Sequence, residues 1–343
     1  MNFIQTLSIC PECYKRIPAD IVIRDGAAWM TKTCDVHGDF EALVDPDASL
    51  IMQHYNTGTR GLNKAVLVPI TPECNMSCSW CYTNGVKTKI CKPEYYDRAM
   101  IDLKLQGFTF LASGGEPTIM PDFFDFISRM KQLGWPIVTM SNMLKFADIR
   151  FMEECATIGM VQNHVLHADF SMQHPKNYDG EIAAAKYGAL CNLERLGIKA
   201  NCIQFSIGSL DELQYIRKFY DDTKNLYNHI RIRTLFGFWK DESEKIYLSQ
   251  LFNEFKQVFG DLMPVFTNDF ESSNIYSLYM RDTNCGISLS SAPTVNNLDV
   301  LSARRPTLAM ALDGKCYSLP VAQIISEGIE KGWYNGYKVE VPK

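Results

Sequence analysis

The sequence predicts an α/β protein: a partial (β/α)6 TIM-like barrel with a small N-terminal metal-binding knuckle and a C-terminal α+β extension. Three observations support this fold class. Short apolar segments alternate with amphipathic ones between residues 65 and 240, cysteines and a histidine gather before residue 40, and a three-cysteine loop directly follows the first apolar segment. Strands that alternate with helices favour a parallel sheet with right-handed crossovers.

The predicted strands are short apolar runs bounded by Gly, Pro or Asn. They cover 65–70, 108–112, 137–140, 165–170, 200–207 and 230–236. Helices are predicted between them from apolar positions three and four residues apart, over 94–105, 121–133, 149–158, 181–196 and 210–222. A sixth amphipathic helix, over 245–259, opens a region that otherwise predicts irregular structure with strands near its end. The expected domains are therefore a knuckle (1–48), a barrel (62–240) and an extension that caps the barrel (241–343).

Composition excludes several classes of protein. The chain has 343 residues, of which 46% are hydrophobic and 21% charged, as in soluble globular proteins. Its 34 basic and 39 acidic side chains give a net charge of −5, which argues against a chain-wide basic surface for nucleic acid. No apolar run reaches the ~18 residues of a membrane span, and no signal peptide is evident at the start. Twelve cysteines in such a chain predict a cytoplasmic protein whose thiols bind metal or do chemistry.

The three-cysteine loop indicates an iron–sulfur cluster. Cys74, Cys78 and Cys81 follow the first predicted strand with spacings of three and two residues. Ordinary four-iron clusters have four cysteine ligands, so three thiolates leave one iron open to a substrate or cofactor. The loop also lies at the carboxyl end of a strand, where barrel folds place their active sites. A zinc loop, or three core cysteines without a ligand, is the alternative.

A glycine-rich turn at the end of the second predicted strand supports the cluster interpretation. It reads Ser113-Gly114-Gly115-Glu116-Pro117. Glycine has no Cβ, so the backbone can approach a ligand closely, and the carbonyl groups and the Glu116 carboxylate can accept hydrogen bonds from an ammonium group. Alone the turn is a weak signal, because such clusters commonly mark plain turns.

Together, the C-x3-C-x-aromatic-C loop and the Gly-Gly-Glu turn resemble the signature of the radical S-adenosylmethionine superfamily. The resemblance implies a 4Fe-4S cluster on Cys74, Cys78 and Cys81, with S-adenosylmethionine bound to the open iron. It also implies a 5′-deoxyadenosyl radical that abstracts hydrogen from a substrate. The residues it places around the cofactor are Trp80 and Tyr82 beside adenine, Gly114, Gly115, Glu116 and Pro117 at the methionyl amine, and Ser141, Asn142, Ser171 and Arg233 at strand ends facing ribose and carboxylate.

The N-terminal cysteines form a second, complete ligand set. Cys10 and Cys13 lie two residues apart, and Cys34 and His37 repeat that spacing after a hairpin turn at Asp25-Gly26. Two such groups are typical of a tetrahedral zinc site, with mononuclear iron as the alternative; unligated thiols beside a surface histidine remain open. This CPxC…CxxHG pattern before the barrel resembles the branch of the superfamily with a rubredoxin-like knuckle.

The function predicted is radical cleavage of a C–H bond in a small molecule or lipid, leading to methylation, C–C coupling or rearrangement. The expected partners are that substrate and an electron donor such as flavodoxin or ferredoxin. One alternative is an isomerase or modification enzyme acting on a nucleotide or nucleobase. Another, from a different class, is a non-catalytic iron–sulfur or zinc protein for sensing or redox relay. Whether Cys285 and Cys316 hold an auxiliary cluster is left open.

Overall fold

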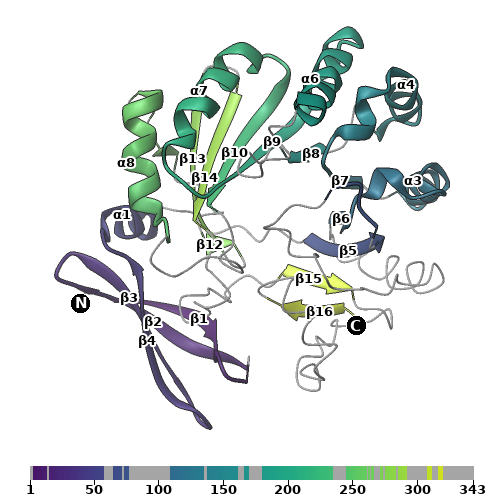
Figure 1. The fold of residues 1–343 in the computed structure, drawn as a ribbon. Coiled ribbons are helices and arrows are strands. Elements are labelled where there is room, and N and C mark those ends of the chain that lie inside the picture. Colours follow the sequence, from purple (N-terminus) through teal and green to yellow (C-terminus); the bar gives the residue numbers. More distant parts are fainter. Residues whose placement is uncertain are drawn as a thin grey trace.

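The computed structural model describes residues 3–13, 15–57, 65–71, 73–76, 109–134, 137–160, 166–169, 180–234, 245–260, 262, 264–265, 271–272, 275–282, 285–291, 307–310 and 316–319. Within these ranges the strands form two sheets, a small antiparallel one and a large, mainly parallel one that curves with helices on its outer side (Figure 1).

The N-terminal sheet is a four-stranded antiparallel meander. Its strands are β1 (Phe3–Ile9), β2 (Arg16–Arg24), β3 (Ala27–Cys34) and β4 (Gly38–Asp45), paired in chain order. Asp25 and Gly26 have φ angles of 50° and 79°, which is the backbone of a two-residue hairpin turn that follows the twist of the strands. The hairpin predicted at Asp25-Gly26 is thus confirmed, and helix α1 (Ser49–Thr57) follows the sheet.

The large sheet contains the six parallel strands that the sequence predicts. They are β5 (Ala65–Thr71), β6 (Thr109–Gly114), β7 (Ile137–Ser141), β8 (Leu166–Asp169), β9 (Ala200–Ile207) and β10 (Tyr227–Thr234). Each pairs in parallel with the next. Strand β10 begins three residues earlier than expected. Its first residues, Tyr227-Asn-His229, are too polar to be recognised as a strand from the sequence, but they pair with β9.

Four of the predicted connecting helices are confirmed. They are α3 (Phe123–Gln132), α4 (Ile149–Thr157), α6 (Gly180–Arg195) and α7 (Glu212–Thr223). The helix expected over 94–105 lies outside the described residues. In Figure 1 these helices stand around the outside of the curved sheet, as the crossovers of a βα-repeat require.

The C-terminal region contributes strands to both edges of this sheet. Beside β10 lies β14 (Cys285–Ser291), parallel to it, followed by antiparallel β13 (Ile275–Asp282) and the short β11 (Pro264–Val265) and β12 (Glu271–Ser272). At the other edge β15 (Thr307–Met310) pairs in parallel with β5, and β16 (Cys316–Leu319) pairs with β15. The extension thus flanks the six strands on both sides.

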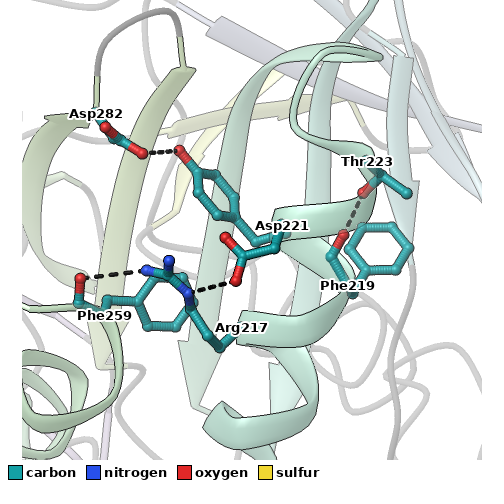
Figure 2. Close-up of polar contacts among 7 residues, drawn as sticks. Arg217, Phe219, Asp221, Thr223, Phe259 and Asp282 are labelled. Atoms are coloured by element: carbon teal, nitrogen blue, oxygen red, sulfur yellow. Dashed lines mark hydrogen bonds and ion pairs between the residues drawn. The ribbon is translucent and has the colours of Figure 1, made fainter.

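Helix α8 (Leu248–Phe259), the predicted amphipathic helix of that region, is held against α7 (Figure 2). The Arg217 guanidinium donates to Asp221 at 2.8 Å and to the carbonyl oxygen of Phe259 at 3.2 Å. The Tyr220 hydroxyl donates to the Asp282 carboxylate at 2.8 Å. Side chains of α7 therefore hold both α8 and the added strand β13.

The N-terminal sheet packs on the same helix. The buried Asp45 carboxylate, at the end of β4, accepts the backbone N–H of Ser249 in the first turn of α8 at 3.0 Å. Ile21 and Met30 belong to one continuous buried cluster with residues of the large sheet such as Ile203 and Ile232. The small sheet therefore shares its core with the large sheet. No helix in the described part of the chain is long and apolar enough to cross a membrane.

Strands β9, β10 and β14 have one apolar and one polar face. Ile203, Phe205, Ile230, Ile232 and Ile287 are buried together, and the Phe205 ring contacts Phe219 of α7 with centroids 5.1 Å apart. The alternate residues face away from that helix layer. We call them the polar wall, and they are Cys202, Gln204, Ser206, His229, Arg231, Arg233, Ser288 and Ser290.

Candidate metal centre and cofactor-binding edge

The four N-terminal ligands meet at one end of the small sheet. Cys10 and Cys13 lie in the turn between β1 and β2, while Cys34 ends β3 and His37 lies in the turn before β4. In a meander these two turns are at the same end, because each hairpin reverses the chain. The four ligand atoms all lie within 4.8 Å of one another.

Their spacing matches a tetrahedral zinc site. Nδ1 of His37 lies 3.5 Å from the sulfur of Cys10 and 3.5 Å from that of Cys34, and the sulfurs of Cys13 and Cys34 are 3.9 Å apart. Zinc with Zn–S of about 2.3 Å and Zn–N of about 2.0–2.1 Å has tetrahedral edges of about 3.6 Å (S–N) and 3.8 Å (S–S). These three distances, and the set of three sulfurs and one nitrogen, therefore fit zinc.

Electrostatics differ among the sulfurs of this site. Hydrogen bonding from the backbone N–H of Val36, with help from His37, lowers the pKa of Cys34 to about 6. Burial raises the pKa of Cys10 to about 11. A bound divalent cation favours the thiolate at every sulfur, so the proton on Cys10 would leave when metal binds. Ile17 and Phe40 pack with the three cysteines in a small apolar cluster.

The second candidate site lies at the carboxyl ends of β5, β6 and β7. Thr71 ends β5, Gly114 ends β6 and Ser141 ends β7. The loops that leave these ends are hydrogen-bonded to one another. We call the described residues 71, 73–76, 114–118 and 141–142 the strand-end junction.

Main-chain hydrogen bonds join the start of the cysteine loop to the glycine-rich turn. The N–H of Gly115 donates to the carbonyl oxygen of Thr71 at 2.6 Å, and the N–H of Glu116 donates to that of Glu73 at 2.7 Å. Cys74 is exposed, and its sulfur accepts the N–H of Met76 at 3.4 Å. An accessible sulfur that accepts an amide hydrogen suits a cluster thiolate. Cys78, Trp80, Cys81 and Tyr82 lie outside the described residues.

Glu116 is the buried centre of the junction, with only 1% of its surface exposed. Its Oε1 accepts from the Thr118 N–H at 3.1 Å, the Thr118 hydroxyl at 2.6 Å and the Ser141 hydroxyl at 2.8 Å. Its Oε2 accepts the N–H of Asn142 at 2.6 Å. Burial raises the pKa of the carboxyl, and these four hydrogen bonds oppose that rise. In this arrangement Glu116 joins β6 to β7.

Asn142 continues this connection to the cysteine loop. Its side-chain Nδ2 donates to Oδ1 of Asn75 at 2.8 Å, and its Oδ1 accepts the N–H of Leu144 at 3.1 Å. Asn75 immediately follows Cys74 in the sequence. The sequence patterns singled out Asn142 but not Asn75 or Thr118. A polar residue next to the first cysteine was the available signal for Asn75.

The other predicted site residues are placed less fully. The backbone of Gly114 and Pro117, the first residue of the 3-10 turn Pro117–Ile119, lies in the junction. Arg233 lies on β10, in the polar wall rather than at the junction. Ser171 is outside the described residues. Cys285 is buried at the start of β14, where burial raises the pKa of its thiol to about 11, and only the backbone of Cys316 is described.

Comparison with known proteins agrees with this picture. A family model described as the HMPTM N-terminal zinc ribbon domain matches residues 3–46. The chain is 28% identical over 190 residues to a 7,8-dihydro-6-hydroxymethylpterin dimethyltransferase from Methanocaldococcus jannaschii, an alignment that covers 46% of this chain. The aligned part spans 37% of that relative's length.

Among solved structures, the chain is similar to Streptococcus suis SuiB bound to S-adenosylmethionine. The TM-score is 0.54 at 13% identity, covering 77% of this chain and 61% of SuiB. SuiB bound to its precursor peptide SuiA gives a TM-score of 0.54 at 12% identity, covering 81% of this chain and 63% of that one. The SuiB likeness shows the fold. Taken with the relative and the zinc ribbon, it confirms the resemblance to radical S-adenosylmethionine enzymes of the branch with an N-terminal metal knuckle.

Proposed function

We propose that the chain is a radical S-adenosylmethionine enzyme that modifies a carbon of a small molecule by first removing a hydrogen atom. The observation that supports this best is the strand-end junction, in which Glu116 and Asn142 tie the glycine-rich turn, the end of β7 and the start of the cysteine loop together. A sensor or relay protein would have no need to hold an amino-acid-binding turn against its cluster loop.

In this proposal Cys74, Cys78 and Cys81 hold a 4Fe-4S cluster, and Trp80, Tyr82 and Ser171 contact the cofactor. When bound, the cluster and S-adenosylmethionine supply a one-electron reduction and a 5′-deoxyadenosyl radical. The protein's own contribution is orientation and exclusion of water.

Within the junction, the backbone of Gly114 and Gly115 would lie against the cofactor's methionyl group. Glu116 would act mainly on its neighbours, because four hydrogen bonds from the protein already engage its buried carboxylate. Asn142 would fix Asn75, and with it the backbone beside Cys74.

The relative points to the first substrate to test. The Methanocaldococcus protein is named for dimethyl transfer to a 7,8-dihydro-6-hydroxymethylpterin. We therefore propose methyl transfer to a reduced pterin, or to a heterocycle of similar size, as the reaction of this chain, with a flavodoxin or ferredoxin as electron donor. Zinc at Cys10, Cys13, Cys34 and His37 would have a structural role, because four protein ligands leave no open position for a reactant.

The proposal is tested with anaerobically reconstituted protein. Iron, zinc and sulfide are measured, dithionite and S-adenosylmethionine are added, and 5′-deoxyadenosine is quantified. We expect 5′-deoxyadenosine to form in the wild type and in Cys191→Ala but not in Cys78→Ala. Cys191 is an exposed cysteine on α6 and serves as the control. Well-folded protein without sulfide or cofactor binding would refute the proposal and favour a zinc protein. A product whose mass increases by methyl groups, formed only with a dihydropterin present, would establish the substrate class.

A further inference from the structure

The polar wall has a composition that the junction does not explain. At neighbouring registers, Gln204 of β9 lies beside Arg231 of β10, and Arg231 lies beside Ser288 of β14. One step further along the strands, Ser206, Arg233 and Ser290 form a second row. Adjacent strands are about 4.8 Å apart, so each guanidinium has small polar neighbours on both sides.

These two rows concentrate positive charge on one surface. Arg231 and Arg233 lie two residues apart on the same strand and therefore on the same face. The residues that flank them on β9 and β14 are serines and a glutamine, which carry no charge. The next residue along this face of β10, His229, adds none at neutral pH, because burial and the charge of Arg231 lower its pKa to about 4.

His229 precedes Arg231 on the same face of β10, and it contacts two residues of β14. Its Nε2 lies 2.8 Å from the Ser288 hydroxyl. Its ring lies so close to Gly286 that a Cβ there would come within 2.5 Å of Nδ1. The histidine is thus held against β14 by a glycine that leaves room for it and by a serine that pairs with it.

A buried polar atom at the register of Arg231 has no hydrogen-bond partner in the described part of the chain. Gln204 has 7% of its surface exposed, and its Oε1 forms no hydrogen bond with any described residue. Leaving such a buried group without a hydrogen bond is destabilising. The amide can also be turned over, which would present an N–H donor at the same place. A ligand with hydrogen-bonding atoms at this position would remove the penalty.

The location suits a substrate. The polar wall lies on the side of the sheet away from the helices, which stand on the outside of its curve (Figure 1). Arg233 is the second-last residue of β10, and Ser206 is the second-last of β9. In parallel strands the carboxyl ends share one edge, so this row lies at the same edge as the strand-end junction.

We propose that Arg231 and Gln204, with Arg233 in the next row, bind a carboxylate or phosphate group of the substrate. The inference rests on the proposed function, because it assigns a substrate class to that enzyme. An arginine fork can bind either oxyanion with two parallel hydrogen bonds. The competing explanation is an internal ion pair with Asp169, which β8 places at the register of Gln204.

Ion binding to the intact holoprotein tests the proposal without requiring turnover. Inorganic phosphate and succinate are titrated separately by calorimetry at constant ionic strength, into wild type, Arg231→Gln, Arg231→Lys and Arg150→Gln. Arg150 is an exposed arginine on α4 and controls for net charge. We expect one or both anions to bind wild type and Arg150→Gln equally, and Arg231→Gln to bind about tenfold more weakly or worse. Arg231→Lys, which keeps the charge but not the fork, should fall between them.

The two anions distinguish the sources, since tighter binding of phosphate or of succinate identifies the group that the site prefers. No binding to wild type, or equal binding to Arg231→Gln, would overturn the proposal and favour the ion pair with Asp169. Loss of anion binding at saturating S-adenosylmethionine would also overturn it, because the site would then belong to the cofactor.

Formation of 5′-deoxyadenosine is measured on the same samples. If anion binding fails while cleavage persists, only this inference fails; if cleavage fails while the anion binds, only the proposed function fails.

Discussion

The N-terminal centre and the strand-end junction, which in our proposal hold zinc and an iron–sulfur cluster, are built in opposite ways. In the small sheet, Cys10, Cys13, Cys34 and His37 come from two hairpin turns at one end, and their ligand atoms already lie within 4.8 Å of one another. At the carboxyl edge of the large sheet, Cys74 is exposed on a loop. That loop is positioned from outside, by main-chain contacts with the glycine-rich turn and by the side chain of Asn142.

The difference follows from what each centre does in our proposal. A closed site needs all its ligands from the protein and gains from a rigid support, so two turns of one antiparallel sheet suffice. An open site must leave a coordination position free, and so the protein supplies fewer ligands and more neighbouring contacts. The first site is encoded locally, whereas the second depends on strands that are distant in the sequence.

The largest effect is expected from opening the closed site. Cys13→Ala removes one of four ligands and should abolish stoichiometric zinc, lowering the melting temperature by about 10 °C or more. The fall should be global, because the small sheet shares its core with the large sheet and Asp45 binds the first turn of α8. Metal analysis and calorimetry measure both quantities, with Cys191→Ala as the cysteine control. Full zinc content in Cys13→Ala would show that the comparison is wrong.

The next effect concerns the centre of the open site. Glu116→Ala leaves four donors without their acceptor and should cost about 3–5 kcal/mol of unfolding free energy. Glu116→Gln, which keeps one oxygen, should cost about 1–3 kcal/mol. Urea unfolding gives both values, and zinc content should stay unchanged in each. An unchanged midpoint for Glu116→Ala would mean that the junction does not depend on this carboxylate.

A third prediction uses pH to separate the large sheet, through His229 of its polar wall, from the N-terminal centre. Because His229 is held neutral with a pKa of about 4, against about 6.5 in the unfolded chain, the unfolded state binds more protons between these values. Stability should therefore fall as pH decreases from about 6.5 to about 4, by about 3 kcal/mol from this group. His229→Gln should make the unfolding free energy depend less steeply on pH in this range, by the uptake of one proton.

The experiment is a series of urea melts at constant zinc, because acid also protonates the ligands of the N-terminal centre. A variant with zinc intact and the same slope as wild type would assign the acid sensitivity to other groups.

The smallest effect is the coupling between Asn75 and Asn142. Asn75→Ala and Asn142→Ala, combined in a double-mutant cycle, should show an interaction of about 0.5–1 kcal/mol. The cycle is needed because Asn142 also binds the N–H of Leu144. In reconstituted protein the same variants should alter the electron paramagnetic resonance signal of the reduced cluster. If the two unfolding free-energy changes simply add and the electron paramagnetic resonance signal is unchanged, the hydrogen bond between Asn75 and Asn142 does not position the cluster loop.

The sequence predicted the closed site well, because everything it needs is local. The Asp25-Gly26 turn, the spacing of the two ligand pairs and the alternating strands between them all lie within residues 10–37. Five helices and six strands were also predicted to within a few residues, since their apolar periodicity reflects the face that each buries. The coarse fold therefore followed from pattern alone.

The rest depended on contacts that no local pattern contains. Glu116 was expected to meet an ammonium group, but its hydrogen-bond partners come partly from Ser141 and Asn142, 25 and 26 residues away. The role of β14 was hidden as well. Its serines alternate with Ile287 and Leu289, and only the pairing with β10 reveals that they continue a polar face. Strand register is set by tertiary packing, which a single sequence does not display.

The placement of the C-terminal strands has a consequence for synthesis. On a ribosome, β5 through β10 emerge well before β14 and β15, the strands that cover the two edges of their sheet. Until then β5 and β10 each present an unpaired row of backbone groups, which is the surface through which sheets join to one another. The last hundred residues therefore protect the nascent protein from aggregation, because β14 covers the edge strand β10 and β15 covers the edge strand β5. Chains truncated before residue 285 should aggregate in proportion to their concentration, with or without zinc bound at the N-terminal centre.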